Sequence, residues 1–165
     1  MNILLGYLNA PHIHIMINHF PVILAPVGTA LMLAGLYRGS EDLKKAAAWT
    51  FVITGLFAGA TFISGDMAAD RLVVLVPGVS GSAITGHDNS ALYALVSAVI
   101  LALFSLWSLF KARGKMLPVR TAVVILAVSV MVSAVMGRTA FLGGKIRHTE
   151  IIPAQSPSPS APVRR

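Results

Sequence analysis

Four long apolar stretches dominate the chain, and each has the length of a membrane-spanning helix. The hydrocarbon core of a bilayer is about 30 Å thick, and a helix needs about 20 apolar residues to cross it. The apolar stretches cover residues 15–37, 46–63, 91–110 and 119–136. Short polar segments join the first stretch to the second and the third to the fourth. The pattern therefore predicts an all-α fold, an integral membrane four-helix bundle of two antiparallel hairpins.

A longer segment, residues 64–90, separates the two hairpins and contains the sequence "ADRLVVLVPGVS". Its polar start and apolar middle predict a short helix lying at the membrane interface between spans two and three. After residue 152 the chain is rich in Pro and Ser, a composition that cannot bury a core. We therefore expect one transmembrane domain over residues 1–152 and a disordered tail over residues 153–165.

Composition agrees with a membrane protein and excludes several classes of site. Of the 165 residues, 56% are hydrophobic and 12% are charged, whereas soluble domains have about 25% charged residues. The chain has no cysteine, which excludes disulfides, thiolate metal sites and covalently attached c-type haem. The net charge of +7 does not indicate nucleic-acid binding, because the basic residues flank apolar segments. The expected partner is the lipid bilayer.

The distribution of basic residues predicts the orientation of the chain in the membrane. Cytoplasmic loops of membrane proteins carry an excess of Lys and Arg. The basic residues of the two short hairpin loops are Arg38, Lys44, Lys45, Lys111, Arg113, Lys115 and Arg120. The segment between the hairpins has only Arg71 among three aspartates. We therefore expect cytoplasmic hairpin loops, and both termini on the periplasmic side of the inner membrane.

All five histidines then fall on the side opposite the hairpin loops. They are His12, His14, His19, His87 and His148, and the acids at the same level are Asp66, Asp70, Asp88 and Glu150. Antiparallel hairpins return their far ends to one face, so these residues can meet at one end of the bundle. Any single histidine there is equally well explained as an interfacial or helix-capping residue. As a cluster they indicate a site, because polar groups near hydrocarbon are costly unless partnered.

Three functions fit this cluster, and the first is membrane electron transfer by b-type haem. Bis-histidine ligation needs two facing imidazoles, which a four-helix bundle can supply. His19 and His87 are the preferred axial pair. His14, His148 and Arg147 are candidates to orient the haem propionates, and the two histidines are candidates to ligate a second haem.

The second function is a non-haem site for zinc, iron or copper, built from imidazole and carboxylate ligands. Its candidate ligands are His14, His19, His87, His148, Asp66 and Glu150. The third is a cofactor-free accessory subunit of a larger respiratory or photosynthetic complex. No motif supports catalysis by the chain alone, so we expect a redox partner protein or a larger membrane complex.

Three short motifs resemble those of a known family. "HIMINHFP" at 14–21 resembles an HPxxVHFP signature, from which it departs at Ile15 and Asn18. Gly65, Asp66, Ala68 and Asp70 resemble a Gly-acid-x-Ala-acid stretch, with Ala69 added before the second acid. This stretch leads to "PGVS" and then to His87 and Asp88. The closing "GGKIRHTEI" resembles a GGxIRHxEI ending.

Together these motifs resemble the DUF2231-type predicted four-helix membrane proteins over about residues 12–152. The resemblance implies the four-span fold. It also implies proximity to electron transfer, because some members are fused to Rieske-type domains, but it implies no defined reaction.

Proline and glycine positions carry further expectations. Pro21 and Pro26 each remove a backbone donor from span one and should kink it. Gly55 and Gly59 form a small-xxx-small pattern that favours close helix packing. The pair 143–144 is expected to turn the chain after span four and to fold His148 back over the bundle.

Overall fold

The chain folds into long antiparallel helices in the computed structural model, which describes residues 10–75, 81–113 and 115–147. The helices are α2 (Ala10–Ile17), α3 (His19–Tyr37), α4 (Glu41–Leu75), α5 (Gly81–Ala112) and α6 (Val119–Arg147). Four segments are long and apolar enough to span a membrane: Ala10–Tyr37, Glu41–Arg71, Gly81–Ala112 and Val119–Ile146. The predicted all-α, four-span fold is confirmed for the described part of the chain.

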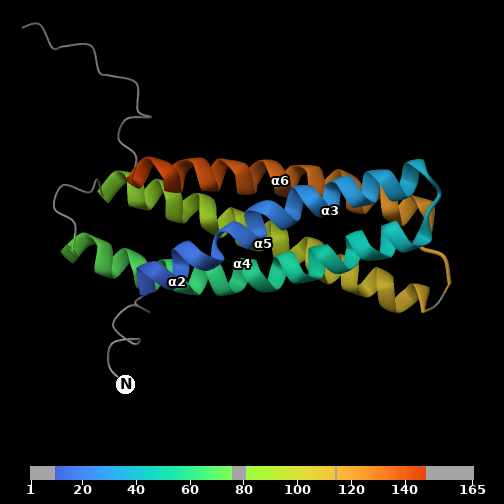
Figure 1. Cartoon of the computed structure of the whole chain (residues 1–165), viewed down its shortest axis with the longest axis horizontal. Helices are drawn as coiled ribbons and strands as arrows, with labels where there is room; N and C mark the ends of the chain where they lie inside the picture. The colour runs from blue at the N-terminus through green and yellow to red at the C-terminus, as the bar shows by residue number, and fades with distance from the viewer. Residues whose placement is uncertain (1–9, 76–80, 114, 148–165) are drawn as a thin grey trace, which may run out of the picture.

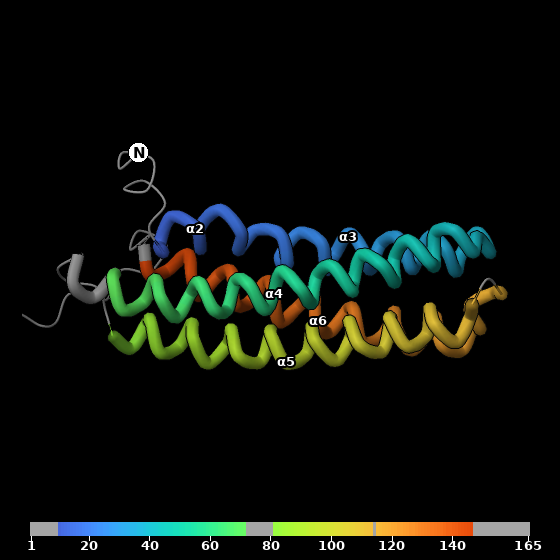
Figure 2. The backbone as a smooth tube through the Cα atoms, turned by 90° about the horizontal axis from the view of Figure 1, so that it is seen from below, coloured from blue at the N-terminus to red at the C-terminus, as the bar shows by residue number. Residues whose placement is uncertain are grey.

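The helices form two hairpins that lie side by side (Figures 1 and 2). Helix α3 packs against α4 and α6, and α5 packs against the same two helices, which closes a ring of four. Helix α2 leans on α4. The start of α2, the end of α4, the start of α5 and the end of α6 therefore share one end of the bundle (Figure 1). We name this end the histidine end, because it carries His14 and His87.

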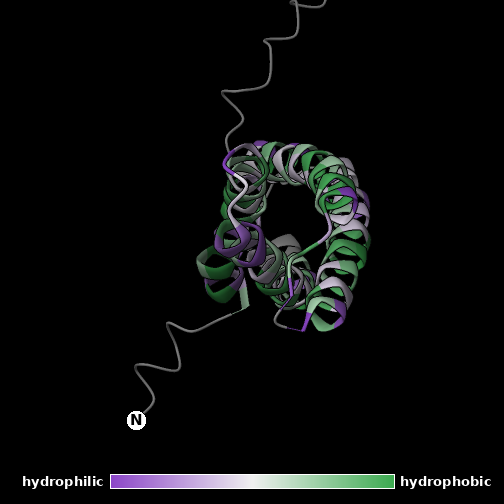
Figure 3. Ribbon diagram, turned by 90° about the vertical axis from the view of Figure 1, so that its right-hand side faces the viewer, coloured by the Kyte–Doolittle hydropathy of each residue, from purple (hydrophilic) through white to green (hydrophobic). Residues whose placement is uncertain are grey.

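Small residues let the helices approach closely. A Cβ atom added to Gly55 would lie 2.5 Å from the Cβ of Ala102 on α5, so only glycine fits at this α4–α5 contact. The expectation of close packing at Gly55 is confirmed, whereas Gly59 faces open space. Apolar side chains such as Leu56 are exposed on the outside, as lipid contact requires, and the view along the axis shows apolar ribbon around the whole ring (Figure 3).

The first span is interrupted at Asn18, between α2 and α3. Pro21 has no backbone N–H to donate to the carbonyl of Ile17, which lies one turn earlier. The hydroxyl of Thr61 on α4 donates to that carbonyl instead, at 3.4 Å. Pro26 lies inside α3 without ending it. The break at Asn18 allows α2 to tilt onto α4.

The end opposite the histidine end is stabilised by a polar cluster of Glu41, Lys44 and the backbone of Leu117, which we name the polar clamp. Glu41 forms an ion pair with the buried Lys44. Its Oε2 accepts the backbone N–H of Leu117 at 2.7 Å, while Lys44 Nζ donates to the carbonyl of the same residue at 3.4 Å. The start of α4 is therefore hydrogen-bonded to the loop between α5 and α6, which links the two hairpins.

Two expectations about the histidine end are wrong. The separate interfacial helix is not found, because α4 continues to Leu75 and α5 already begins at Gly81. Polar residues in this stretch are compatible with helix because the backbone keeps its internal hydrogen bonds where the helix leaves the hydrocarbon. Gly143 and Gly144 do not turn the chain either, since α6 runs through them to Arg147. The tail, residues 153–165, lies outside the described residues.

Candidate cofactor-binding site

His14 projects from α2 onto α4. Its Nδ1 lies 3.1 Å from the carbonyl oxygen of Thr61 and 3.2 Å from Oγ of Ser64. The ring lies against Gly65, where an added Cβ would come within 2.9 Å of the ring carbon Cε1. Glycine at position 65 is therefore what allows the imidazole to lie flat on α4.

His87 has the same surroundings in the other hairpin. Its Nδ1 lies 3.1 Å from the carbonyl oxygen of Thr139 on α6. Its ring lies against Gly143, where an added Cβ would again be 2.9 Å from Cε1. The hydroxyl of Thr139 donates to the carbonyl of Val135 and lies 2.7 Å from the buried Oγ of Ser90. Gly143 therefore allows the His87 ring to approach α6 closely, and it does not turn the chain.

The two halves of the bundle thus repeat one arrangement. In each half, a histidine on the first span bonds to the carbonyl of a threonine on the second span, and its ring packs on the glycine four residues later. The sequences that provide this are "TFISG" at 61–65 and "TAFLG" at 139–143. A threonine and a glycine four apart share one helix face, so a single TxxxG segment presents both contacts.

The hydrogen bonds fix the tautomer of both rings. A carbonyl oxygen can only accept, so Nδ1 of His14 and of His87 must carry the proton. In the neutral imidazole the lone pair is then on Nε2. A histidine whose Nδ1–H is held by a backbone carbonyl is the usual form of a metal-ligating histidine. In both rings Nε2 therefore carries the lone pair that could bind a metal.

His14 on α2 and His87 on α5 both belong to the histidine end of the bundle. Helix α2 packs on α4, and α5 packs between α4 and α6. The two imidazoles are therefore presented at one end of the bundle from different helices.

The other expected site residues are placed differently. His19 is exposed, and its Nδ1 bonds to the carbonyl of Ile15 on its own chain segment at 3.0 Å. His12 and Asp66 are also exposed. In the described ranges, no three His, Asp or Glu side chains come close enough to hold a metal ion. The remaining candidates, His148, Glu150 and the side chain of Arg147, lie outside the described residues.

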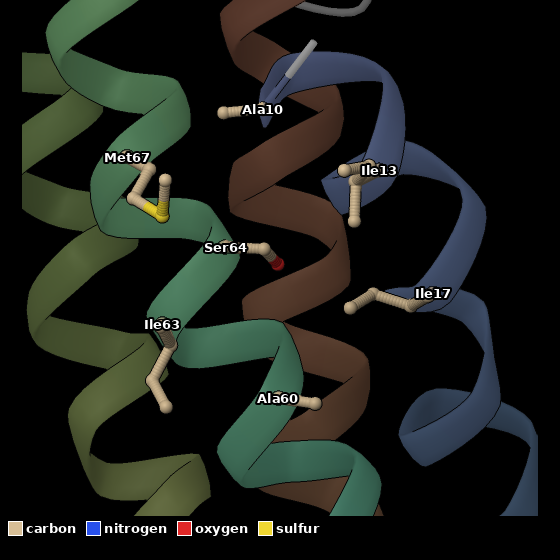
Figure 4. Close-up of a pocket in the computed structure, with 7 residues that line it drawn as sticks. All are labelled: Ala10, Ile13, Ile17, Ala60, Ile63, Ser64 and Met67. Atoms are coloured by element: carbon tan, nitrogen blue, oxygen red, sulfur yellow. The ribbon is translucent and has the colours of Figure 1, made fainter. Parts of the chain in front are cut away.

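A shallow apolar groove runs between α2 and α4 beside His14 (Figure 4). Ile13 and Ile17 form its α2 wall, and Ser64 extends its hydroxyl oxygen into it from α4. That hydroxyl donates to the carbonyl of Thr61 at 2.9 Å, so it is already engaged in holding the His14 site. We regard the groove as a lipid-facing flank of the site.

Sequence reasoning preferred His19 over His14, missed the threonines, and did not assign to Gly65 and Gly143 their contacts with the histidine rings. The groups that bond to the two histidines are the backbone carbonyls of Thr61 and Thr139. Every residue has a backbone carbonyl, so the side-chain sequence does not identify them. The repeated TxxxG segment was a usable signal, because it appears once in span two and once in span four. Its spacing does not identify the partner histidine, because His14 precedes Thr61 by 47 residues and His87 precedes Thr139 by 52.

The comparisons with known proteins agree with this architecture. The chain matches the family described as predicted membrane protein (DUF2231) over residues 10–152. This range includes every described helix and nearly the whole chain. No curated protein and no solved structure matches the chain significantly. The chain therefore belongs to the DUF2231 family of predicted membrane proteins.

Proposed function

We propose that the chain binds b-type haem between His14 and His87 and takes part in membrane electron transfer. The observation that supports this most directly is the matched pair of imidazoles, each anchored through Nδ1 to a carbonyl of another helix. His14 and His87 would hold the haem iron, each through Nε2 of its neutral imidazole. Because the chain has no cysteine, the haem would be held without thioether bonds to the protein.

The number of available ligands favours haem over a non-haem ion. Zinc in proteins takes three or four protein ligands. The described residues include two histidines that are each held by a backbone carbonyl of another helix, and no group of three ligands that could hold a metal ion. The porphyrin itself supplies four nitrogen ligands, so two histidines complete the coordination of a haem iron.

The surrounding residues have defined tasks in this proposal. The carbonyls of Thr61 and Thr139 hold each ring in one orientation and make its Nε2 more basic. Gly65 and Gly143 leave room for the rings. Bound haem would supply reversible one-electron transfer between ferric and ferrous iron. The donor and acceptor would be a redox partner protein or a larger membrane complex.

Charge distribution supports a periplasmic location for the site. The two basic hairpin loops lie at the opposite end of the bundle from His14 and His87 (Figure 1). If these loops follow the usual bias and remain cytoplasmic, the chain lies in the inner membrane with both termini periplasmic. The site would then exchange electrons with partners at the periplasmic surface.

Three alanine variants test the proposal. His14→Ala and His87→Ala should each abolish the reduced-minus-oxidised α-band of the purified protein. His19→Ala is the matched control, because His19 lies one turn further along the same span and is exposed. Its α-band should be retained. Loss of the band in His19→Ala with retention in His14→Ala would instead support the His19–His87 pair.

The unmodified protein distinguishes the remaining functions. If it shows no Soret band after expression with ample haem, the haem proposal fails. Zinc, iron or copper bound to the colourless protein would then support a non-haem site. A colourless and metal-free protein would support the accessory subunit.

A further inference from the structure

We propose that the hairpin-loop end of α5 binds the headgroup of an anionic membrane phospholipid. A hollow at this end is lined by Trp107, Phe110, Lys111 and Arg113. It combines two large apolar side chains with two cations in a single surface feature. This inference is independent of the haem proposal, because the hollow lies at the opposite end of the bundle from His14 and His87.

The chemistry of the lining fits the two parts of a phospholipid. Trp107 and Phe110 are exposed on the lipid-facing surface, where they can pack against an acyl chain and the glycerol. Tryptophan is typical of the level at which the headgroups begin. Lys111 and Arg113 follow directly and are exposed. Neither makes an ion pair or a side-chain hydrogen bond within the described residues, so both can bind a phosphate.

The backbone at Arg113 ends α5. Arg113 has a φ of 30°, in the left-handed region that side chains other than glycine rarely adopt. Its N–H still closes the last turn of α5 by donating to the carbonyl of Leu109 at 3.1 Å. A residue in the left-handed region commonly follows the last residue of a helix, so this conformation marks the end of α5 at Ala112 and is not itself evidence for a ligand.

Charge complementarity specifies an anionic lipid. The segment 111–120 carries four basic residues and no acidic one. The segment 38–45 of the other hairpin carries three basic and two acidic residues, and its Lys44 is neutralised by Glu41. The net charge is therefore +4 for the segment 111–120 and +1 for the segment 38–45. A zwitterionic headgroup would bring its own cation to the hollow, so a net-negative headgroup fits this site better.

Quenching of Trp107 fluorescence tests the proposal in the full-length protein. The chain has two tryptophans, so Trp49→Phe leaves Trp107 as the single reporter. The protein is reconstituted in phosphatidylcholine vesicles with a minor fraction of brominated phosphatidylglycerol or, separately, brominated phosphatidylcholine. We expect the site to prefer the anionic lipid by about thirty-fold, which corresponds to about 1 kcal/mol for each of the two cations.

Matched variants assign this preference to the hollow. Lys111→Gln/Arg113→Gln should abolish it, and the exposed positions of both residues leave the core untouched. Arg38→Gln/Lys45→Gln removes two cations from the other hairpin loop and should retain it. Trp107→Phe, in which Trp49 is the reporter, should show equal quenching by both lipids. Equal quenching of Trp107 by both lipids, or an unchanged preference in Lys111→Gln/Arg113→Gln, would overturn the proposal.

Discussion

Adding one methyl group at Gly65 or Gly143 should weaken haem binding sharply. The added Cβ would lie 2.9 Å from Cε1 of His14 or His87, whereas carbon atoms in contact prefer about 3.5–4.0 Å. The ring must therefore retreat by roughly 0.6–1.1 Å. The hydrogen bond from Nδ1 is already 3.1 Å long, and a shift of this size can break it.

The expected loss combines two contributions. The lost hydrogen bond costs about 1 kcal/mol. Strain from the extra methyl adds about 1 kcal/mol, at the low end for overpacking in a well-packed site. The sum of about 2 kcal/mol corresponds to roughly thirty-fold weaker haem binding for each variant.

Haem titration of the detergent-purified apoprotein, followed by Soret absorbance, measures this effect. Gly137→Ala is the control, because Gly137 also lies on α6 but an added Cβ there would meet open space. It should bind haem as the unmodified protein does. If Gly65→Ala and Gly143→Ala bound haem with unchanged affinity, the rings would not be positioned by these glycines and our account of the site would be refuted.

Three further predictions concern the scaffold. Gly55→Ala should destabilise the bundle by about 1–3 kcal/mol in detergent unfolding, because its methyl overlaps the neighbouring helix, whereas Gly59→Ala should change stability by less than about 0.5 kcal/mol; equal effects would contradict the packing. Glu41→Gln should lower the free energy of unfolding by about 2 kcal/mol, which is less than for a fully buried ion pair because the Glu41 side chain is 19% exposed. Adding Lys44→Met should restore part of this loss, because it removes the unpaired buried charge. An unchanged stability of Glu41→Gln would show that the polar clamp does not stabilise the bundle. A reporter active only outside the cytoplasm should be active when fused after Arg165 and silent in the first hairpin loop, and the reverse would invert the proposed topology.

The four spans could be predicted because crossing a bilayer imposes a length and a composition that the sequence displays openly. Their ends could not. Helix α4 begins at Glu41 and continues to Leu75, well beyond the apolar stretch 46–63, because a helix can extend past the hydrocarbon wherever its polar side chains reach water. The same reason explains why residues 64–75, expected to include a separate interfacial helix, are part of α4.

The site was only partly predictable. His14 and His87 could be assigned to one end of the bundle from the hairpin topology. Choosing between His14 and His19 required knowing that the chain breaks at Asn18 and that α2 leans on α4. Gly143 illustrates the same limit, since a glycine near a helix end is compatible with both a turn and a close contact. Only the position of the His87 ring decides between them.

The central claim is that His14 and His87 form one bis-histidine haem site. Its most direct test is the absorption spectrum of the detergent-purified, unmodified protein, oxidised and reduced, together with haem quantification on the same sample. We predict one b-type haem per chain, with a ferric spectrum typical of six-coordinate, low-spin iron and a sharp α-band on reduction. A five-coordinate, high-spin spectrum would contradict the paired ligation, and a protein without haem would contradict the claim itself.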